Sequence, residues 1–454
     1  MSDIVSVALG VICFLVVLTV IVVIHEAGHA WVARRCGARV TEFFVGMPFG
    51  PEASRVSGRS GIKYGATFAL LGGYTKIAGM LPPDDERLSF VLTLVNARGR
   101  ISVDEVAEVL GCDAADAQTA LAFLADWGSI EEVWPEGVRH ARSDYPAEYR
   151  TVRRDAKGLT VYDHGHDFSG EGVNPAGAPY LPDVSADDFF EAESSRTYQG
   201  LNLPKRLAVL VAGVFCNLLL AFVIFMAYYM IHGVAGVASL DVAQVQDGSV
   251  AAEAGMVAGD RVVSVGGEQI DSYDVLGEAL EGVRGAGEFE LVYSHDGVET
   301  AATVELAEGE TLGVYYGVAY YGLGFGEAAY CSLVYIGEVA STVASLLVPS
   351  QTVEVLEGSA GVVGIAAMTQ DAVSSGLWSV LLLTGMLSLS LGWMNLLPIP
   401  PLDGGKVLIE LIQGVIRRPV PLRVQGAANL VGIALFLLLF VFMVFQDVSR
   451  LAGL

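Results

Sequence analysis

The sequence predicts a polytopic α-helical membrane protein with about four transmembrane helices. Hydrophobic residues make up 53% of its 454 residues and charged residues only 17%, so the chain is more apolar than an ordinary soluble protein. Four apolar runs are candidates to cross a bilayer, and they cover residues 4–24, 207–231, 377–397 and 430–445. We expect the first run to be a retained helix rather than a cleaved signal, because its start is acidic and it is about long enough to span.

The charges between these runs predict the orientation in the cell membrane. Cytoplasmic loops carry an excess of lysine and arginine. The basic residues near the runs fall in loops that four crossings put on one side: Arg34, Arg35, Lys205, Arg206, Lys406, Arg417, Arg418 and Arg423. Residues 240–310 instead contain many acidic residues and only Arg261 and Arg284 as basic ones. We therefore expect both termini and residues 240–310 outside the cell, and the basic loops in the cytoplasm.

The net charge and the cysteines exclude several classes of protein. A net charge of −25 argues against nucleic acid as the main partner and against a broadly basic membrane-surface binder. The five cysteines are scattered and odd in number, so they predict neither a disulfide framework nor a zinc ribbon.

Short strands are expected between the first two runs, within a first segment of residues 1–83. The pattern predicts strands at residues 40–45, 64–70 and 72–76, with glycines and prolines between them. We expect a membrane-associated β-hairpin here. Its unpaired edge would suit capture of an extended peptide by strand addition.

Residues 84–195 have a soluble composition and predict a winged-helix-like α+β insert followed by a loop. A capping box at Ser102 and Glu105 opens one helix, which Gly111 ends, and Asp113 starts a second through 114–127, which Gly128 ends. Residues 88–97 ahead of these helices, and residues 130–133 with Val138 behind them, complete the likeness to a winged helix. The second of the capped helices carries Asp116 and Asp126 and no basic residue, whereas phosphate contact needs basic side chains. We expect the insert to contact a cytoplasmic protein or to regulate the chain, and not to bind DNA.

The end of this insert contains a histidine cluster in a polar loop. Residues 141–195 are rich in proline, glycine, aspartate and serine, and they include His164-Gly165-His166-Asp167. The cluster is either a metal site or a solvated turn, and its composition favours the turn.

Residues 238–312 predict a PDZ-like domain outside the membrane, after the second helix in segment 196–237. The pattern is a short helix near 248–256, an alternating strand within 258–267, a helix at 271–280 and strands at 288–293 and 301–306. Residues 313–376 follow as an amphipathic or connecting region. Its apolar part, 326–348, carries Glu327 and Glu338, which favours a partly embedded helix over a full span.

A metal-binding motif follows directly on the first apolar run. In His25-Glu26-Ala27-Gly28-His29, the two histidines lie one helical turn apart, so both imidazoles can hold one metal ion. Glu26 is near enough to act as a general base toward water at that ion. The alternative is a capped helix end with solvated side chains. Ionisable groups at the end of a membrane helix are costly and usually functional, which favours the metal site.

A third ligand is expected far along the chain, because a catalytic zinc normally has three protein ligands. Asp403 is the best candidate, since it follows the prolines of Asn395-Leu396-Leu397-Pro398-Ile399-Pro400-Pro401-Leu402 and precedes two glycines in segment 377–454. Broken backbone at membrane depth is tolerated only where it is buried in protein or lines a wet cavity. The alternative for Asp403 is a turn residue at the membrane surface. Asn395 could bind a substrate carbonyl or simply pack helices.

These motifs together resemble the site-2 protease family of intramembrane zinc metalloproteases. The resemblance rests on the segments HEAGH, LGGYTKIAG, AGVFCN and NLLPIPPLDGG. Two further segments, GVVGIA and QDVSRL, resemble the bacterial branch of the family that carries an extracytoplasmic PDZ domain. The resemblance covers about residues 1–80 and 196–454. It implies one zinc ion held by His25, His29 and Asp403, with Glu26 as general base. Val214 stands where the family usually has proline, and the insert lies outside the common pattern.

The resemblance implies a zinc-dependent endopeptidase that cleaves transmembrane segments of single-pass membrane proteins. Anti-sigma factors and remnant signal peptides are the substrate classes it suggests. Asn217 and Asn395 match polar positions of the family, and Gly72 and Gly73 are candidate substrate-binding residues on the strand edge. The alternatives are a non-catalytic membrane receptor or scaffold and, more weakly, a metal transporter.

Overall fold

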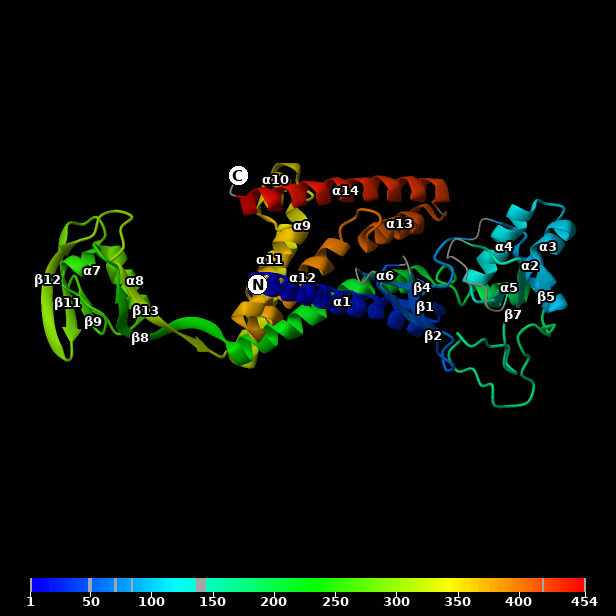
Figure 1. The fold of residues 1–454 in the computed structure, drawn as a ribbon, viewed down its shortest axis with the longest axis horizontal. Helices are drawn as coiled ribbons and strands as arrows, with labels where there is room; N and C mark the ends of the chain where they lie inside the picture. The colour runs from blue at the N-terminus through cyan, green and yellow to red at the C-terminus, as the bar shows by residue number, and fades with distance from the viewer. Residues whose placement is uncertain are drawn as a thin grey trace. The chain divides into compact units, whose positions relative to one another are not determined.

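The computed structural model describes residues 2–47, 51–68, 72–82, 85–135, 144–418 and 420–452 (Figure 1). The chain folds into two compact units. The first contains residues 1–224 and 333–454, and the second contains residues 225–332.

Four helices are long and apolar enough to cross a membrane, which confirms the expected number. These spans are Ala8–Cys36, Leu203–His232, Leu377–Asn395 and Leu422–Arg450. They belong to helices α1 (Ser2–Cys36), α6 (Leu203–Ala227, continued by the π-helical turn Tyr228–His232), α12 (Leu377–Asn395) and α14 (Leu422–Ala452). α1 extends well past the apolar run, because the chain contains no proline there and leaves the helical conformation only at Gly37, whose φ is +102°.

The region 313–376 contains more helix than an amphipathic connector. Helices α9 (Phe325–Ser345), α10 (Pro349–Gly358) and α11 (Val362–Ser375) occupy it. α10 and α11 form a pair bent by 43°, which makes a fifth crossing if the pair is one span. α11 packs against α1 and α12. Its first turn is capped by buried Asp447, which accepts hydrogen bonds from the backbone N–H groups of Gly361 and Gly364 at 3.0 and 2.8 Å.

A four-stranded mixed sheet takes the place of the predicted hairpin. Its strands are β1 (Val40–Val45), β2 (Glu52–Val56), β3 (Lys63–Thr67) and β4 (Gly73–Ile77), in the order β2-β3-β1-β4. The strands predicted here are present as β1, β3 and β4, and β2 is a further strand that the sequence analysis did not identify. β2 pairs antiparallel with β3. β3 in turn pairs with β1, and these two strands run parallel. β4 pairs antiparallel with β1 and forms an edge of the sheet among the described strands.

The two capped helices that the sequence predicts are present in the insert, and further strands and helices accompany them. It comprises α2 (Leu88–Arg98), β5 (Arg100–Ser102), α3 (Val103–Leu110), α4 (Ala114–Asp126), β6 (Ile130–Val133), β7 (Glu148–Thr151) and α5 (Ala186–Ser194). The three strands form one sheet in the order β5-β7-β6. Ser102 and Asp113 cap α3 and α4 as expected, and Gly111 is left-handed. Val138 lies outside the described residues, and a winged-helix assignment stays a prediction.

The segment predicted as a loop after the insert is more ordered than expected and holds buried charges. It contributes β7 and α5. Arg39, next to β1, is 1% exposed, and it donates to Asp163 at 2.7 Å and to Glu193 at 2.8 Å. Arg154 donates to the same Glu193 at 2.9 Å. Because buried charges are stable only when paired, this ion cluster fixes the insert to the four-stranded sheet.

The second unit is built around a sheet that is larger than predicted. Strands β8 (Val234–Val245), β9 (Arg261–Val265), β10 (Glu268–Gln269), β11 (Glu288–His295), β12 (Val298–Glu305) and β13 (Val314–Tyr321) accompany helices α7 (Val250–Glu253) and α8 (Tyr273–Val283). The predicted helices and strands are present. The predicted boundaries of 238–312 are too narrow, because β13 pairs with β8 and completes the sheet. The PDZ-like assignment stays a prediction.

Candidate metal centre

Three side chains from distant parts of the first unit converge at one point. His25 and His29 lie one turn apart on α1, and Asp403 is the first residue of α13 (Asp403–Ile416). The Nε2 atoms of the two histidines are 3.1 Å apart, and Oδ2 of Asp403 is 3.1 Å from each of them. All three residues are buried. In the part of the chain that the structure describes, no other group of three histidine, cysteine or acidic side chains is close enough to hold a metal ion.

The Nδ1 atom of His29 is hydrogen-bonded to the backbone of α6. Nδ1 of His29 lies 2.7 Å from the carbonyl oxygen of Val209 on α6, which can only accept a hydrogen bond. A neutral His29 therefore donates from Nδ1 and turns the lone pair of Nε2 toward Asp403. Two acceptor atoms at 3.1 Å repel one another unless a cation lies between them.

The dimensions of the triangle fit a zinc ion. Ligand atoms about 2.0–2.1 Å from a tetrahedral zinc are roughly 3.3 Å apart, close to the observed separations of 3.1 Å. Nitrogen and carboxylate oxygen are both zinc ligands, and three protein ligands leave one position open, as catalytic zinc sites require. The contact from His29 to Val209 is the outer hydrogen bond that orients such a ligand.

The glycines after Asp403 allow its approach. A Cβ atom at Gly404 would clash with the carbonyl groups of Leu396 and Leu397, and one at Gly405 would lie 2.7 Å from the carbonyl carbon of Ile399. The start of α13 therefore lies directly against the backbone that breaks after α12. The second carboxylate oxygen of Asp403 is 3.3 Å from Nζ of Lys406.

Close packing of α6 against α1 completes the walls of the centre. A Cβ at Gly213 would lie 2.7 Å from Nε2 of His25, and one at Gly28 would lie 2.7 Å from the carbonyl oxygen of Ala212. The sequence analysis did not identify Gly213, Gly28 or Val209 as site residues. The small residues in the AGVFCN and HEAGH segments are the only sequence signal for the two glycines, and Val209 has none because it contributes its backbone carbonyl. Val214, in place of the family's proline, is buried in a continuous α6.

Glu26 lies between the two histidines in sequence and faces the sheet. Strand β4 packs on α1 at this residue. The hydroxyl of Thr75 donates to the backbone carbonyl of Glu26 at 3.0 Å. A Cβ at Gly73 would lie 3.6 Å from Cγ of Glu26 and 2.9 Å from the carbonyl oxygen of Phe44. The absence of a side chain at Gly73 therefore lets the edge strand lie beside Glu26.

The remaining candidate substrate-binding residues are Asn217, Asn395 and Gly72, which lie on or next to three different elements near the centre. Asn217 is one helical turn beyond Gly213 on α6, and it is fully buried against α12, where its backbone carbonyl accepts from Ser388 at 2.9 Å. Its side-chain amide has no hydrogen-bond partner among the described residues. Asn395 is the last residue of α12 and is half-buried. Gly72 precedes β4 with a φ of +101°.

The histidine cluster in the insert is a turn near the surface. His164 is exposed and His166 is partly buried, with its Nδ1 atom 2.8 Å from the carbonyl oxygen of Asp163. The metal-site alternative has no further support within the described ranges, where the one ligand group is that of His25, His29 and Asp403.

Comparison with known proteins identifies the family. The model of peptidase family M50 matches residues 13–439. The zinc metalloprotease RasP of Shouchella clausii is 26% identical over 460 residues, which cover 97% of this chain and 99% of that protein. RasP of Geobacillus kaustophilus is 26% identical over 455 residues, which cover 97% and 98%. The family implies zinc, and the buried His-His-Asp cluster agrees with it. The chain therefore belongs to peptidase family M50, the site-2 protease family, and is an intramembrane zinc metalloprotease.

Proposed function

We propose that His25, His29 and Asp403 hold one catalytic zinc ion and that Glu26 is the general base. The convergence of the three ligand atoms, with Glu26 on the same helix and an edge strand beside it, is the observation that carries this proposal. The reaction is hydrolysis of a peptide bond within a membrane-spanning segment of another protein.

Each residue of the metal centre has a separate role in peptide-bond hydrolysis. Zinc, when bound, acts as a Lewis acid toward the scissile carbonyl and lowers the pKa of water. Glu26 takes the proton from the attacking water and passes it to the nitrogen of the leaving amine. Val209 holds His29 in the tautomer that leaves its Nε2 atom free to bind. The packing of α6 and α13 around the centre excludes bulk water from the other sides.

Strand β4 presents the substrate to Glu26 in an extended form. A peptide bond in a helix is shielded, so the substrate must unwind before attack. The outer edge of β4 offers backbone groups for strand addition, and Gly72 and Gly73 at the start of this strand bind the substrate backbone. Asn395 and Asn217 serve as polar groups toward the substrate backbone.

The substrate is a single-pass membrane protein that has already been shortened outside the cell, such as an anti-sigma factor or a remnant signal peptide. The active site faces the cytoplasm and the second unit lies outside, as the loop charges require. The PDZ-like unit binds the end of the substrate or excludes substrates with large outer domains. The insert binds a cytoplasmic protein.

The test compares cleavage of a tagged single-pass model substrate by wild type and by Glu26→Gln in liposomes. We expect the variant to lose nearly all cleavage and to keep its zinc. Glu108→Gln, at an exposed position on α3, is the matched control and should cleave normally. Equal cleavage by wild type and Glu26→Gln would remove Glu26 from the mechanism. No cleavage by either protein over several substrates would favour the receptor or scaffold.

The third ligand has a separate test. Zinc content of purified Asp403→Ala should fall well below that of wild type, because two histidines alone hold the ion weakly. Undiminished zinc in this variant would count against Asp403 as a ligand.

A further inference from the structure

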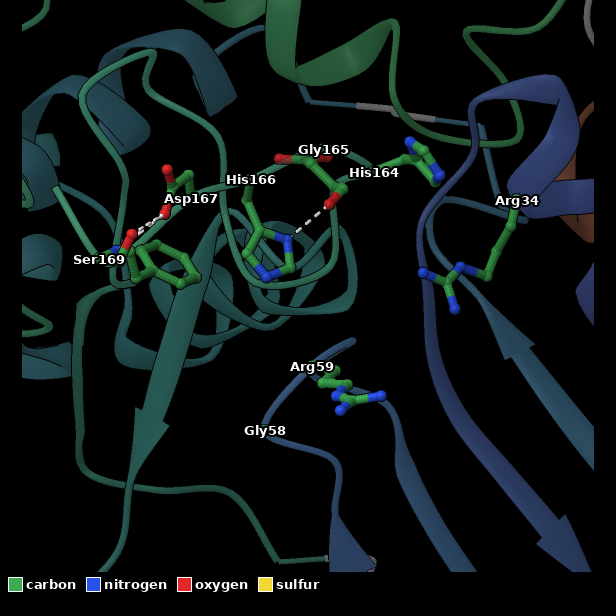
Figure 2. Close-up of a pocket in the computed structure, with 10 residues that line it drawn as sticks. Arg34, Gly58, Arg59, His164, Gly165, His166, Asp167 and Ser169 are labelled. Carbon is green, nitrogen blue, oxygen red and sulfur yellow. Dashed lines mark hydrogen bonds between the residues drawn. The ribbon is translucent and has the colours of Figure 1, made fainter.

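A basic recess lies at the end of α1, outside the metal centre. Two adjoining cavities of about 540 and 680 Å³ share Arg34 and His164 in their linings. The first also includes Arg59, from the turn between β2 and β3, and residues 163–169 of the insert. Figure 2 shows Arg34 and Arg59 reaching toward the same open space below the loop that carries His164 and His166.

The arginines of this recess lack acidic partners. Within the described residues, Arg34, Arg35 and Arg59 form no ion pair, whereas the buried Arg39 and Arg154 do. The lining also contains two acids, of which one is paired with a buried arginine and the other accepts only from neutral groups. Asp163 binds Arg39 at 2.7 and 2.8 Å, and Asp167 accepts from Ser169 at 2.6 and 2.9 Å. Three unpaired arginines against the single unpaired carboxylate of Asp167 leave the recess with an excess of positive charge, in a chain whose net charge is −25.

The place of the recess in the fold indicates the source of its ligand. Arg34 and Arg35 are in the last turn of α1, at the end of the span Ala8–Cys36. Trp31, one turn earlier, is 62% exposed, and the guanidinium of Arg35 lies 5.3 Å from the centre of its ring. Tryptophan and arginine in this arrangement are typical of the membrane–water interface. The recess is thus at the level of lipid headgroups.

We propose that Arg34, Arg35 and Arg59, together with His164, bind the phosphate of an anionic lipid headgroup. Arginine matches phosphate because its planar guanidinium donates two parallel hydrogen bonds. The lining comes from α1, the sheet and the insert, so a lipid in the recess contacts all three and supports the insert on the sheet. The proposal depends on membrane insertion and on none of the catalytic roles proposed above.

The test measures lipid binding to the full-length protein by native mass spectrometry in detergent. Phosphatidylglycerol and phosphatidylcholine are titrated against wild type, Arg34→Gln, Arg59→Gln and Arg55→Gln. We expect wild type to prefer phosphatidylglycerol, and each of the first two variants to bind it about five-fold more weakly, the effect of about one kcal/mol per arginine near a membrane. Arg55 is an exposed arginine on β2 outside both cavities, so Arg55→Gln is the matched control.

The design separates a lipid from a soluble phosphate and from a folding defect. Glycerol phosphate is titrated as the free headgroup. Displacement of phosphatidylglycerol by equal concentrations of it would overturn the proposal in favour of a soluble phosphate ligand. Equal binding of the two lipids by wild type, or wild-type binding by Arg59→Gln, would also overturn it. Arg59 is exposed on a turn, so its substitution leaves the core intact.

Discussion

Gly213 of α6 lies directly against the imidazole of His25, so that a Cβ atom there would be 2.7 Å from Nε2 of His25. It would be closer still to Nε2 of His29. Because both contacts are to the atoms that face Asp403, the metal centre depends on the absence of a side chain at this position. α6 contributes no proposed metal ligand, but its close approach at Gly213 determines how tightly the two histidines are enclosed.

We predict that Gly213→Ala lowers zinc affinity by about ten-fold or more, the usual effect of disturbing the surroundings of a metal ligand. The added methyl must displace either a histidine or α6. The measurement is zinc content after dialysis against a graded series of chelator concentrations. Gly426→Ala is the matched control, since a Cβ at Gly426 on α14 meets nothing within 4 Å. Unchanged zinc retention by Gly213→Ala would show that α6 can move away without cost.

A second prediction concerns the edge strand. Gly73→Val should reduce cleavage at least ten-fold while zinc content stays normal, because its Cβ would lie 2.9 Å from the carbonyl oxygen of Phe44 and 3.2 Å from Val22. The strand must then move away from Glu26. Ala53→Val, on exposed strand β2, is the control for a larger side chain in the same sheet. Cleavage at the wild-type rate by Gly73→Val would contradict the role of β4 in presenting the substrate.

The proposed metal ligands and the helix ends of the insert could both be predicted from the sequence. His25, His29 and Asp403 could be identified because their chemistry at the ends of apolar runs has few structural alternatives. The ends of α3 and α4 could also be predicted, because Ser102 and Asp113 act on backbone groups three residues away.

The parts that could not be predicted depend on contacts between distant residues. No local pattern shows that β3 lies parallel to β1, since this follows from the pairing of β2 with β3. Likewise, Arg39 and Glu193 are separated by 154 positions, and each reads as an ordinary surface charge until folding buries both.

The buried ion cluster predicts acid sensitivity of the insert. Burial alone would raise the pKa of the Glu193 carboxyl, but the charges of Arg154 and Arg39 outweigh it and hold that pKa well below its usual range. The pKa of Asp163 is lowered in the same way by Arg39. A carboxyl with a lower pKa in the folded state stabilises the fold above its unfolded pKa and loses this contribution as pH falls. We expect the insert to separate from the sheet as pH drops below about 4, measured by limited proteolysis between residues 84 and 195.

The matched substitution for this cluster is Arg39→Met, which keeps an unbranched apolar stem and removes the charged guanidinium. It removes the main partner of buried Asp163 and one of the two buried arginines paired with Glu193, so we expect a loss of about 3–5 kcal/mol in the free energy of unfolding. Arg98→Met, at an exposed pair with Glu105, is the control and should cost at most about 1 kcal/mol. Equal thermal stability of the two variants would show that the cluster contributes little.

The last prediction concerns Asp126, which connects the insert to the substrate strand. Its carboxylate accepts a hydrogen bond from the backbone N–H of Gly79 at 3.0 Å and lies 3.4 Å from Nζ of Lys76, the next-to-last residue of β4. Asp126→Ala removes both contacts, and loss of a hydrogen bond of roughly 1 kcal/mol corresponds to about a five-fold change in rate. We expect kcat/KM for a membrane substrate to fall by about this factor with zinc content unchanged, because the end of β4 loses its support while the ligands do not move. Asp116→Ala, on the same helix and 59% exposed, should cleave normally. If Asp126→Ala and Asp116→Ala cleave at the same rate, α4 does not position β4, and any influence of the insert on proteolysis must pass through the Arg39 cluster instead.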